Sequence, residues 1–310
     1  MKIVYWGSSS SSAEILDSLI ENNFDIVLVI TQPDRQKGRG KKLLPTPVKV
    51  LATQNNIVVL SPDNPNEDAT LDKIANCKPD LFFLCAYAKL LGKELLRIPN
   101  KGAVNLHFSL LPQLRGAAPI QRAIMQGFEK TGVTTFFMNE SLDRGEIIMQ
   151  QQTRLQEFET YGELEKRLTD IGKTITKQTI EKIMEGNFKT TKQNNAKKSY
   201  AKKILKEERI IDWNLPAIEI ARKINGFSPS PGSYAFFRGK RIILLKARTG
   251  TATQGKVGML FVGKQLQVLA GNGKTIFIEK LKPEGKKAIS ARDFINGFRV
   301  TSEDYFQNQK

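Results

Sequence analysis

Short apolar runs and segments with helical spacing alternate along the first 189 residues of this 310-residue chain. Strands are expected at residues 2–6, 24–31, 58–60, 81–86, 102–107, 132–138 and 147–150. Helices are expected between and after them, at residues 13–21, 48–55, 71–76, 117–126 and 164–184. Residues 81–86 are apolar without interruption, which is typical of a strand buried on both faces of a parallel sheet. The alternation therefore predicts an α/β fold with a Rossmann-like parallel sheet covered by helices.

The last third of the chain has another pattern, in which short apolar stretches are separated by glycines. One helix is expected at residues 217–224, and strands at 233–237, 241–247, 256–262, 265–270 and 275–281. Strands at this spacing predict a smaller, OB-like β-barrel. Residues 190–205 are polar with few apolar anchors and form the expected linker. We therefore expect one domain at residues 1–189 and a second at 206–310.

Positive charge is concentrated in the second part of the chain. Residues 1–189 hold 24 Lys and Arg against 22 Asp and Glu, whereas residues 190–310 hold 24 against 9. One interpretation is the solvated lysine of a generally basic proteome. Segregation into one half favours instead a polyanionic partner, most simply nucleic acid, because neutralising phosphates makes such charge useful.

Composition argues against several other classes. The two cysteines, Cys77 and Cys85, have no disulfide or zinc spacing, and with a single histidine in the chain no Cys/His metal site is expected. The longest apolar run, at residues 81–88, is far shorter than the ~20 residues that span a bilayer. The first residues run directly into a serine stretch rather than a signal peptide. We expect a cytoplasmic protein without a membrane span or an obligate protein partner.

The single histidine, His107, is the only imidazole available for proton chemistry near neutral pH. Asn105 precedes it by two positions, so both side chains point to the same side of an extended strand. Pro112 and the Gly116–Pro119 stretch end regular structure soon afterwards, at the kind of strand-to-loop boundary where open α/β sheets bind ligands. A lone histidine is also commonly a hydrogen-bonded structural group, and that alternative stays open on spacing alone.

Three further segments have both a functional and a structural interpretation. Asp143 precedes Gly145 in a predicted hairpin, where it either caps its own turn or reaches the imidazole. Residues 31–49 carry six basic residues and predict a long exposed loop, either simply solvated or gripping phosphate beside His107. The serine run at residues 8–12 offers hydroxyls and a helix N-terminus, but it does not match G-x-G-x-x-G. No P-loop occurs either, so neither NAD nor ATP is expected as a cofactor.

Taken together, these motifs resemble the folate-dependent formyltransferases over nearly the whole chain. The resemblance rests on Asn105-Leu-His107-Phe-Ser-Leu-Leu-Pro, Arg115-Gly-Ala-Ala-Pro-Ile-Gln-Arg, Thr131-Gly-Val-Thr and Leu142-Asp143-Arg-Gly. Three other segments resemble in particular the branch that acts on methionyl-tRNA: the basic residues 31–43, Ile211-Asp-Trp, and Leu281-Lys-Pro-Glu-Gly-Lys-Lys. The resemblance implies transfer of a formyl group from 10-formyltetrahydrofolate to the α-amine of methionyl initiator tRNA, without a metal or nucleotide cofactor.

The resemblance also implies roles for particular residues. The catalytic set would be Asn105, His107 and Asp143. The folate pocket would be lined by Cys85, Ala86, Tyr87, Ala88, Lys89, Leu90 and Leu91, with Ser109, Leu110, Leu111 and Pro112 closing over the pterin. The tRNA would be held by Arg35, Lys37, Arg39, Lys41, Lys42, Lys203, Lys206, Lys286 and Lys287, with Arg39 entering the acceptor stem.

The chain departs from the family pattern at several positions. The serine run replaces the family's usual Gly-Thr-Pro-x-Phe-Ala, Ala88 and Gly92 stand where a glycine and a proline are usual, and Ser230 replaces a tryptophan. Three alternatives remain: a formyltransferase for another amine, on a nucleotide or an amino sugar; a formyl-folate hydrolase; and a non-catalytic RNA-binding relative. The basic second domain argues against the first, the basic loop against the second, and the retained Asn105, His107 and Asp143 against the third.

Overall fold

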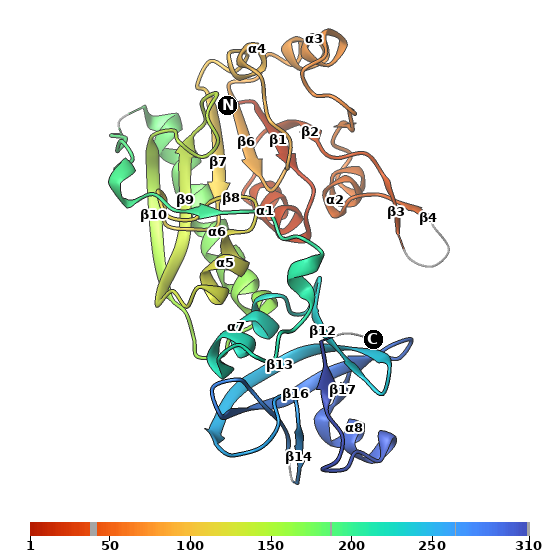
Figure 1. Cartoon of the computed structure of the whole chain (residues 1–310). Coiled ribbons are helices and arrows are strands. Elements are labelled where there is room, and N and C mark those ends of the chain that lie inside the picture. Colours follow the sequence, from red (N-terminus) through yellow and green to blue (C-terminus); the bar gives the residue numbers. More distant parts are fainter. Residues whose placement is uncertain (38–41, 187, 264, 309–310) are drawn as a thin grey trace. The chain divides into compact units, whose positions relative to one another are not determined.

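The computed structural model describes residues 1–37, 42–186, 188–263 and 265–308. These residues form two compact units (Figure 1), which we describe separately. Unit 1 consists of Met1–Pro119, Thr131–Thr153 and Lys166–Ala201, and unit 2 of Ile120–Lys130, Arg154–Glu165 and Lys202–Lys310.

A seven-stranded sheet forms the centre of unit 1. Its strands are β1 (Ile3–Gly7), β2 (Ile26–Ile30), β5 (Val59–Leu60), β6 (Leu81–Cys85), β7 (Ala103–His107), β9 (Lys130–Phe137) and β10 (Ile147–Arg154), in the order β10-β9-β7-β6-β1-β2-β5. The pairs β1/β2, β1/β6, β2/β5 and β6/β7 are parallel, whereas β9 runs antiparallel to β7. Because the central strands are parallel, their carboxyl ends share one edge, and that edge carries the candidate site.

Helices bury both faces of this sheet. They are α1 (Ser10–Glu21), α2 (Pro47–Gln54), α3 (Asp68–Asn76), α4 (Lys93–Leu96) and the greater part of α6 (Tyr161–Glu185), whereas α5 (Pro119–Met125) groups with unit 2. On one face, a Cβ on Gly172 of α6 would lie 3.1 Å from Ile15 Cδ1 and 3.2 Å from Leu106 Cδ2, so α6 packs tightly against α1 and β7. On the other face, Ile74 of α3 and Leu95 of α4 join the buried cluster of Phe82 and Leu84. The predicted Rossmann-like fold is thus confirmed.

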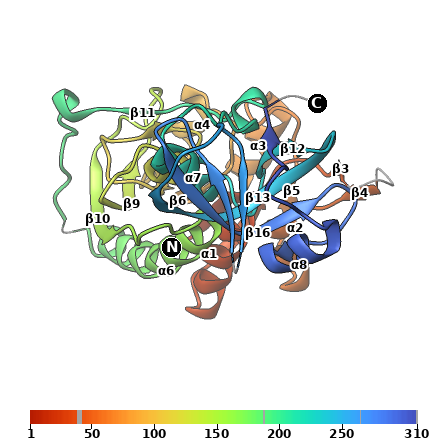
Figure 2. The same ribbon diagram turned by 60° about the horizontal axis from the view of Figure 1, so that its bottom comes forward.

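Unit 2 is built on an antiparallel sheet that curls into a half-barrel (Figure 1, Figure 2). Its elements are α7 (Ala217–Gly226), β12 (Ser233–Phe237), β13 (Lys240–Ala252), β14 (Leu260–Val262), β15 (Leu266–Leu269), β16 (Lys274–Pro283), β17 (Ile289–Ser290), α8 (Ala291–Phe298) and β18 (Phe306–Gln307). The strand order is β14-β15-β16-β13-β12-β18, and a bridge between Met259 and Tyr305 brings the two ends of that path together. An apolar core that includes Trp213, Ile224 and Phe294 fills the curl. The predicted β-rich second unit is confirmed.

Two segments differ from expectation. The basic segment is not simply a loop, because β3 (Arg35–Lys37) and β4 (Lys42–Leu44) pair as an antiparallel hairpin. The expected linker at residues 190–205 is anchored to unit 1 in its first part. There β11 (Tyr200–Ala201) pairs with β8 (Arg115–Gly116), and Thr191 bridges Ile147. Backbone hydrogen bonds hold this segment, and these need no apolar side chains, so its polar composition did not reveal them.

The remaining elements are short helical turns: η1 (Asn195–Lys197) and η2 (Glu207–Arg209). Helix α8 was not expected from the sequence; its N-cap is Ser290, whose hydroxyl accepts from Asp293 N. Among the residues described, no helix is both long and apolar enough to cross a bilayer.

Candidate active site

Strand β7 carries Asn105 and His107 to the carboxyl edge of the sheet of unit 1. In register, Trp6 lies beside Leu84, Leu84 beside Asn105, and Asn105 beside Phe136 of the antiparallel strand β9. Asn105 is half-buried and His107 is buried. The two-residue spacing therefore places the amide and the imidazole on one face of β7, as predicted.

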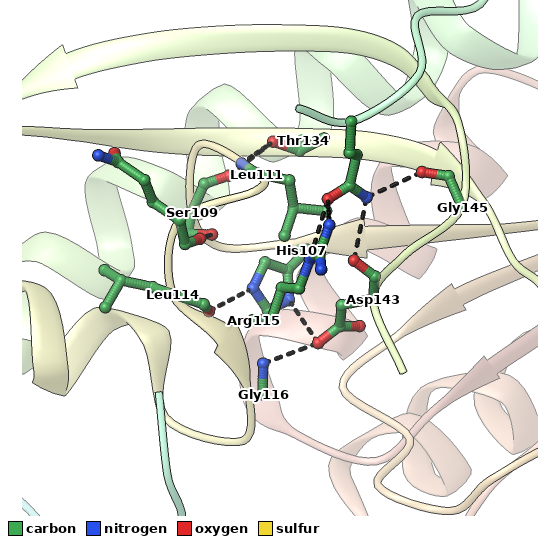
Figure 3. A network of polar contacts seen from close by, with 11 residues as sticks. His107, Ser109, Leu111, Leu114, Arg115, Gly116, Thr134, Asp143 and Gly145 are labelled. Carbon is green, nitrogen blue, oxygen red and sulfur yellow. Dashed lines mark hydrogen bonds and ion pairs between the residues drawn. The ribbon is translucent and has the colours of Figure 1, made fainter. Parts of the chain in front are cut away.

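Two contacts fix the orientation of the His107 ring (Figure 3). Its Nε2 lies 3.0 Å from the carbonyl oxygen of Leu114, and its Nδ1 lies 3.9 Å from Oδ2 of Asp143. Because a carbonyl oxygen only accepts, Nε2 carries the hydrogen in the neutral ring and Nδ1 is left with its lone pair toward the carboxylate. At 3.9 Å the Asp143 contact is longer than a hydrogen bond, and it places the carboxylate on the Nδ1 side of the ring.

Asp143 lies in the turn between β9 and β10, and its side chain is only 8% exposed. The Gly116 N–H donates to Asp143 Oδ2 over 2.8 Å, which holds the carboxylate beside the imidazole. The backbone of Asp143 has φ +52°, in the left-handed region. At Gly145 a Cβ would lie 1.5 Å from the carbonyl oxygen of Phe137, so only glycine lets this turn approach β9 closely. The turn thus reaches the Asn105/His107 edge, one of the two interpretations left open by the sequence.

The Ser109–Pro112 segment follows β7 and is fastened to β9 and β10. Thr134 Oγ1 donates to the Ser109 carbonyl over 2.6 Å, and the Leu111 N–H donates to Thr134 Oγ1 over 3.2 Å. Gln150 Nε2 donates to the Leu111 carbonyl. Leu110 and Pro112 are half-buried, and a Cβ on Gly132 of β9 would lie 2.6 Å from Leu110 Cδ2.

The loop after β6 contains the other folate-binding candidates. Ala86 and Ala88 have positive φ angles, +51° and +64°, and both are exposed. Tyr87 between them is buried against Trp6, and burial raises the pKa of its hydroxyl to about 12, so it stays a neutral hydrogen-bond donor near neutral pH. Leu90 is 69% exposed, whereas Leu91 is buried. Cys85 closes β6 in the buried core, and Lys89 Nζ donates to the carbonyls of Pro62 and Asp63.

The basic candidates fall in both units. In unit 1, Arg35 donates to Gln32 Oε1 over 3.1 Å, and Lys42 is exposed on β4. Arg39 and Lys41 lie outside the described residues, as does the side chain of Lys37. The other four candidates, Lys203, Lys206, Lys286 and Lys287, lie in unit 2, and all four are exposed. Of these, Lys286 lies with its Nζ 4.9 Å from the centroid of the Phe298 ring.

Two residues in contact with this site were not singled out from the sequence. Arg115 is 1% exposed, and its guanidinium donates from Nε and Nη2 to Gln193 Oε1, at 3.0 and 2.6 Å. Gln193 Nε2 donates in turn to the carbonyls of Asp143 and Gly145. Arg115 was visible only as part of a motif, and Gln193 lay in the expected linker, so no sequence signal connected them.

The site can therefore offer a neutral amide donor, an imidazole and a buried carboxylate around one small region. In the parts of the chain that the structure describes, no group of three or more His, Cys, Asp or Glu side chains could hold a metal ion. The residues present suit acyl transfer to an amine, where a donor stabilises an oxyanion and a base removes a proton.

Comparison with known proteins agrees with this chemistry. Residues 1–180 match the formyl transferase family and residues 203–299 its C-terminal domain. The fold of the chain also resembles two solved structures. HypX from Aquifex aeolicus in complex with tetrahydrofolic acid superposes with a TM-score of 0.68 at 18% sequence identity. The alignment covers 96% of this chain and 47% of HypX. WlaRD, a sugar 3N-formyl transferase, has a TM-score of 0.68, 19% identity, and coverage of 93% and 99%. The chain belongs to the formyl transferase family.

Curated relatives narrow the family further. The methionyl-tRNA formyltransferase of Carboxydothermus hydrogenoformans is 38% identical over 309 residues, which cover 99% of this chain and all of the relative. That of Bacillus velezensis is 36% identical over 306 residues, covering 98% and 96%. Within the family, the chain belongs to the methionyl-tRNA formyltransferases.

Proposed function

We propose that this protein transfers the formyl group of 10-formyltetrahydrofolate to the α-amino group of methionyl initiator tRNA, in the cytoplasm, for the initiation of protein synthesis. The observation that carries the proposal is the convergence of Asn105, His107 and Asp143 at one sheet edge. That convergence occurs in a chain that matches methionyl-tRNA formyltransferases from end to end.

In this proposal the three side chains divide the chemistry. The new bond joins the methionine nitrogen to the formyl carbon, and the bond from that carbon to the folate nitrogen breaks. The Asn105 amide donates to the oxyanion that forms during the attack, a contribution of ~3–4 kcal/mol for a well-placed donor. His107 Nδ1, the ring nitrogen left free by the Leu114 contact, takes the proton from the attacking amine and returns it to the leaving folate nitrogen.

Asp143 supports this proton transfer. Its Oδ2 lies on the Nδ1 side of the ring, where the carboxylate stabilises the imidazolium that forms when Nδ1 takes the proton. The Gly116 N–H keeps the carboxylate in place.

The substrates are assigned to the surfaces that suit them chemically. A flat pterin needs apolar faces and backbone hydrogen-bonding groups at its edge. The loop at residues 85–91 offers exposed Leu90 and a backbone with positive φ at Ala86 and Ala88. Phosphates need cations, which Arg35 and Lys42 on the hairpin, and Lys203, Lys206, Lys286 and Lys287 in unit 2, supply. Arg39 remains the residue we expect to enter the acceptor stem.

The test is formyl transfer from 10-formyltetrahydrofolate to methionyl initiator tRNA, run beside deacylated tRNA, free methionine and buffer alone. We expect formylated product only with the charged tRNA. Folate turnover that does not depend on the charged tRNA would move the assignment to another amine or to hydrolysis. Absence of turnover with every acceptor would leave a non-catalytic RNA-binding protein.

A further inference from the structure

Gln193 uses the full hydrogen-bonding capacity of its amide around the candidate site. Its two N–H groups face the carbonyls of Asp143, at 3.0 Å, and Gly145, at 2.8 Å. Its oxygen accepts from Nε and Nη2 of Arg115. Because a guanidinium only donates, Arg115 fixes which end of the amide is the oxygen and so directs both N–H groups at the turn.

Arg115 is an unusual residue to find in this position. Its side chain is 1% exposed, and its Nη1 has no hydrogen-bond partner among the described residues. Burying a guanidinium with an unsatisfied group costs stability, typically ~1–3 kcal/mol for the group alone. The remaining guanidinium bonds go to Gln193 and to Asn195 Oδ1. The fold therefore accepts the free-energy cost of burying Arg115, and the hydrogen bonds of this side chain connect through Gln193 to the Asp143 turn.

The turn itself needs outside support. Asp143 holds a left-handed backbone, φ +52°, which costs a side-chain-bearing residue on the order of 1 kcal/mol. The Gly116 bond restrains one carboxylate oxygen, whereas the two Gln193 bonds restrain the backbone carbonyls on either side of Arg144. Both restraints come from residues next to, or bonded to, Arg115.

We propose that Gln193 is a positioning residue, which holds the Asp143 turn so that the carboxylate faces His107 Nδ1, and that Arg115 orients Gln193. The proposal rests on the reaction proposed above. It assigns Gln193, in the segment that the sequence marked as a linker, a part in positioning the site.

Gln193→Glu separates positioning from folding. Glutamate keeps the contact with Arg115 as an ion pair but offers only acceptors, so both bonds to the turn are lost. We expect kcat to fall about 10- to 100-fold, because a displacement of about 1 Å in a catalytic group has this effect. Both KM values should change less than about twofold. Gln193→Ala should show the same pattern, and the matched control Asn195→Ala, which removes another Arg115 contact, should stay within about twofold of wild type.

The single histidine provides a second readout that does not need turnover. All imidazole nitrogen resonances of the ¹⁵N-labelled protein belong to His107. In wild type they should report the tautomer with hydrogen on Nε2, and at fixed pH the Nδ1 resonance should move in Gln193→Glu and Gln193→Ala but not in Asn195→Ala.

The results distinguish failure of the positioning role from failure of the proposed formyl transfer. Unchanged kcat in Gln193→Glu, a loss that appears only in the KM for tRNA, or an unmoved Nδ1 resonance overturns the positioning role. If wild type fails to formylate methionyl-tRNA, the proposed function fails, and the Nδ1 resonance alone then decides the positioning role.

Discussion

At the scale of single residues, the site consists of groups with separate tasks, and the clearest is Asn105. It lies two positions before His107 on β7, and in the proposed reaction it is the neutral donor to the oxyanion, whose removal typically costs ~100-fold or more in kcat. We expect Asn105→Asp, which keeps the size but removes the donor, to lower kcat by about that factor with an unchanged melting temperature. Exposed Asn55→Asp on the same unit is the control. A kcat within about threefold of wild type would remove Asn105 from the catalytic set.

His107 gives a complementary prediction. Because its Nε2 is bonded to the Leu114 carbonyl, a residue that preserves only that bond keeps the structure but not the proton transfer. We expect His107→Gln to lower kcat about 100-fold or more. Near-normal single-turnover rates in this variant would show that Nδ1 does not carry the proton.

Strand periodicity and a turn before glycine are local signals, so the sequence predicted the shared face of Asn105 and His107 and the turn at Asp143, whereas the catalytic roles of these residues follow from the family resemblance and stay predictions. The sequence missed the burial of Arg115, since arginine is normally exposed. It also missed Gln193, which is 50 positions from Asp143 and meets it only through the tertiary fold.

At the scale of elements, the basic hairpin is joined at its base to the loop at residues 85–91. Buried Gln32 donates from Nε2 to the Tyr87 carbonyl over 2.8 Å and accepts from Arg35 Nη2, while its N–H donates to Ser8 Oγ. The serine run and the hairpin are thus parts of one polar junction. The sequence predicted a loop where this hairpin lies, because two strands of three residues each are too short to show an alternation of apolar and polar residues.

This junction predicts that Gln32→Leu disturbs the loop at residues 85–91, which we propose binds folate. The substitution leaves the Tyr87 carbonyl without its donor, an effect of ~1–3 kcal/mol for a buried group. We expect the KM for 10-formyltetrahydrofolate to rise about 5- to 10-fold with kcat less affected. Gln36→Leu, exposed on β3 of the same hairpin, should leave both constants unchanged. Equal effects from the two substitutions would refute a specific role for the junction.

Within unit 2, α5 is tied to the segment before α7 by an ion pair. Arg122 contacts Glu208 at 2.6 and 2.9 Å, and its hydrogen bond holds the pKa of the Glu208 carboxyl below its ordinary value of 4.5. Since the folded-state pKa is the lower one, this stabilisation is complete above pH 4.5 and is lost as pH falls through the folded-state value.

We therefore expect Glu208→Gln to lower the melting temperature at pH 7 by roughly 2–4 °C, equivalent to ~1 kcal/mol in a unit of this size. The difference from wild type should shrink as pH falls below 4.5. Exposed Glu207→Gln is the neighbouring control, with little effect at either pH. A melting difference that is independent of pH would mean that the pair does not act through the carboxylate charge.

At the scale of the whole molecule, alternation of apolar runs was enough to predict the Rossmann-like unit, and glycine-separated strands the curled one. The compact units nevertheless exchange short segments, since residues 120–130 and 154–165 group with unit 2. Long-range contacts, rather than composition, decide such grouping. The positive charge is concentrated in residues 190–310, which hold 24 basic against 9 acidic residues, and this range does not coincide with unit 2 because residues 190–201 group with unit 1.

Because of this charge, we expect added salt to raise the KM for tRNA far more than the KM for 10-formyltetrahydrofolate. Each phosphate contact contributes a slope of about 0.7 to 0.9 to the fall of log affinity with log salt, so the KM for tRNA should rise steeply between 50 and 200 mM salt. The folate KM should rise much less. Replacing Lys286 and Lys287 by Gln should reduce the tRNA slope by up to two such contributions and raise the tRNA KM at low salt.

Lys73 and Lys78 make the matched control, because they precede β6 and so lie toward the amino edge of the sheet, away from His107. If their replacement by Gln flattens the slope equally, net charge alone attracts the tRNA and the basic half has no preferred surface. If only the Lys286 and Lys287 variant flattens it, the charge of unit 2 is a binding surface, and kcat at saturating tRNA should be unchanged because these lysines act on binding and not on the chemistry at His107.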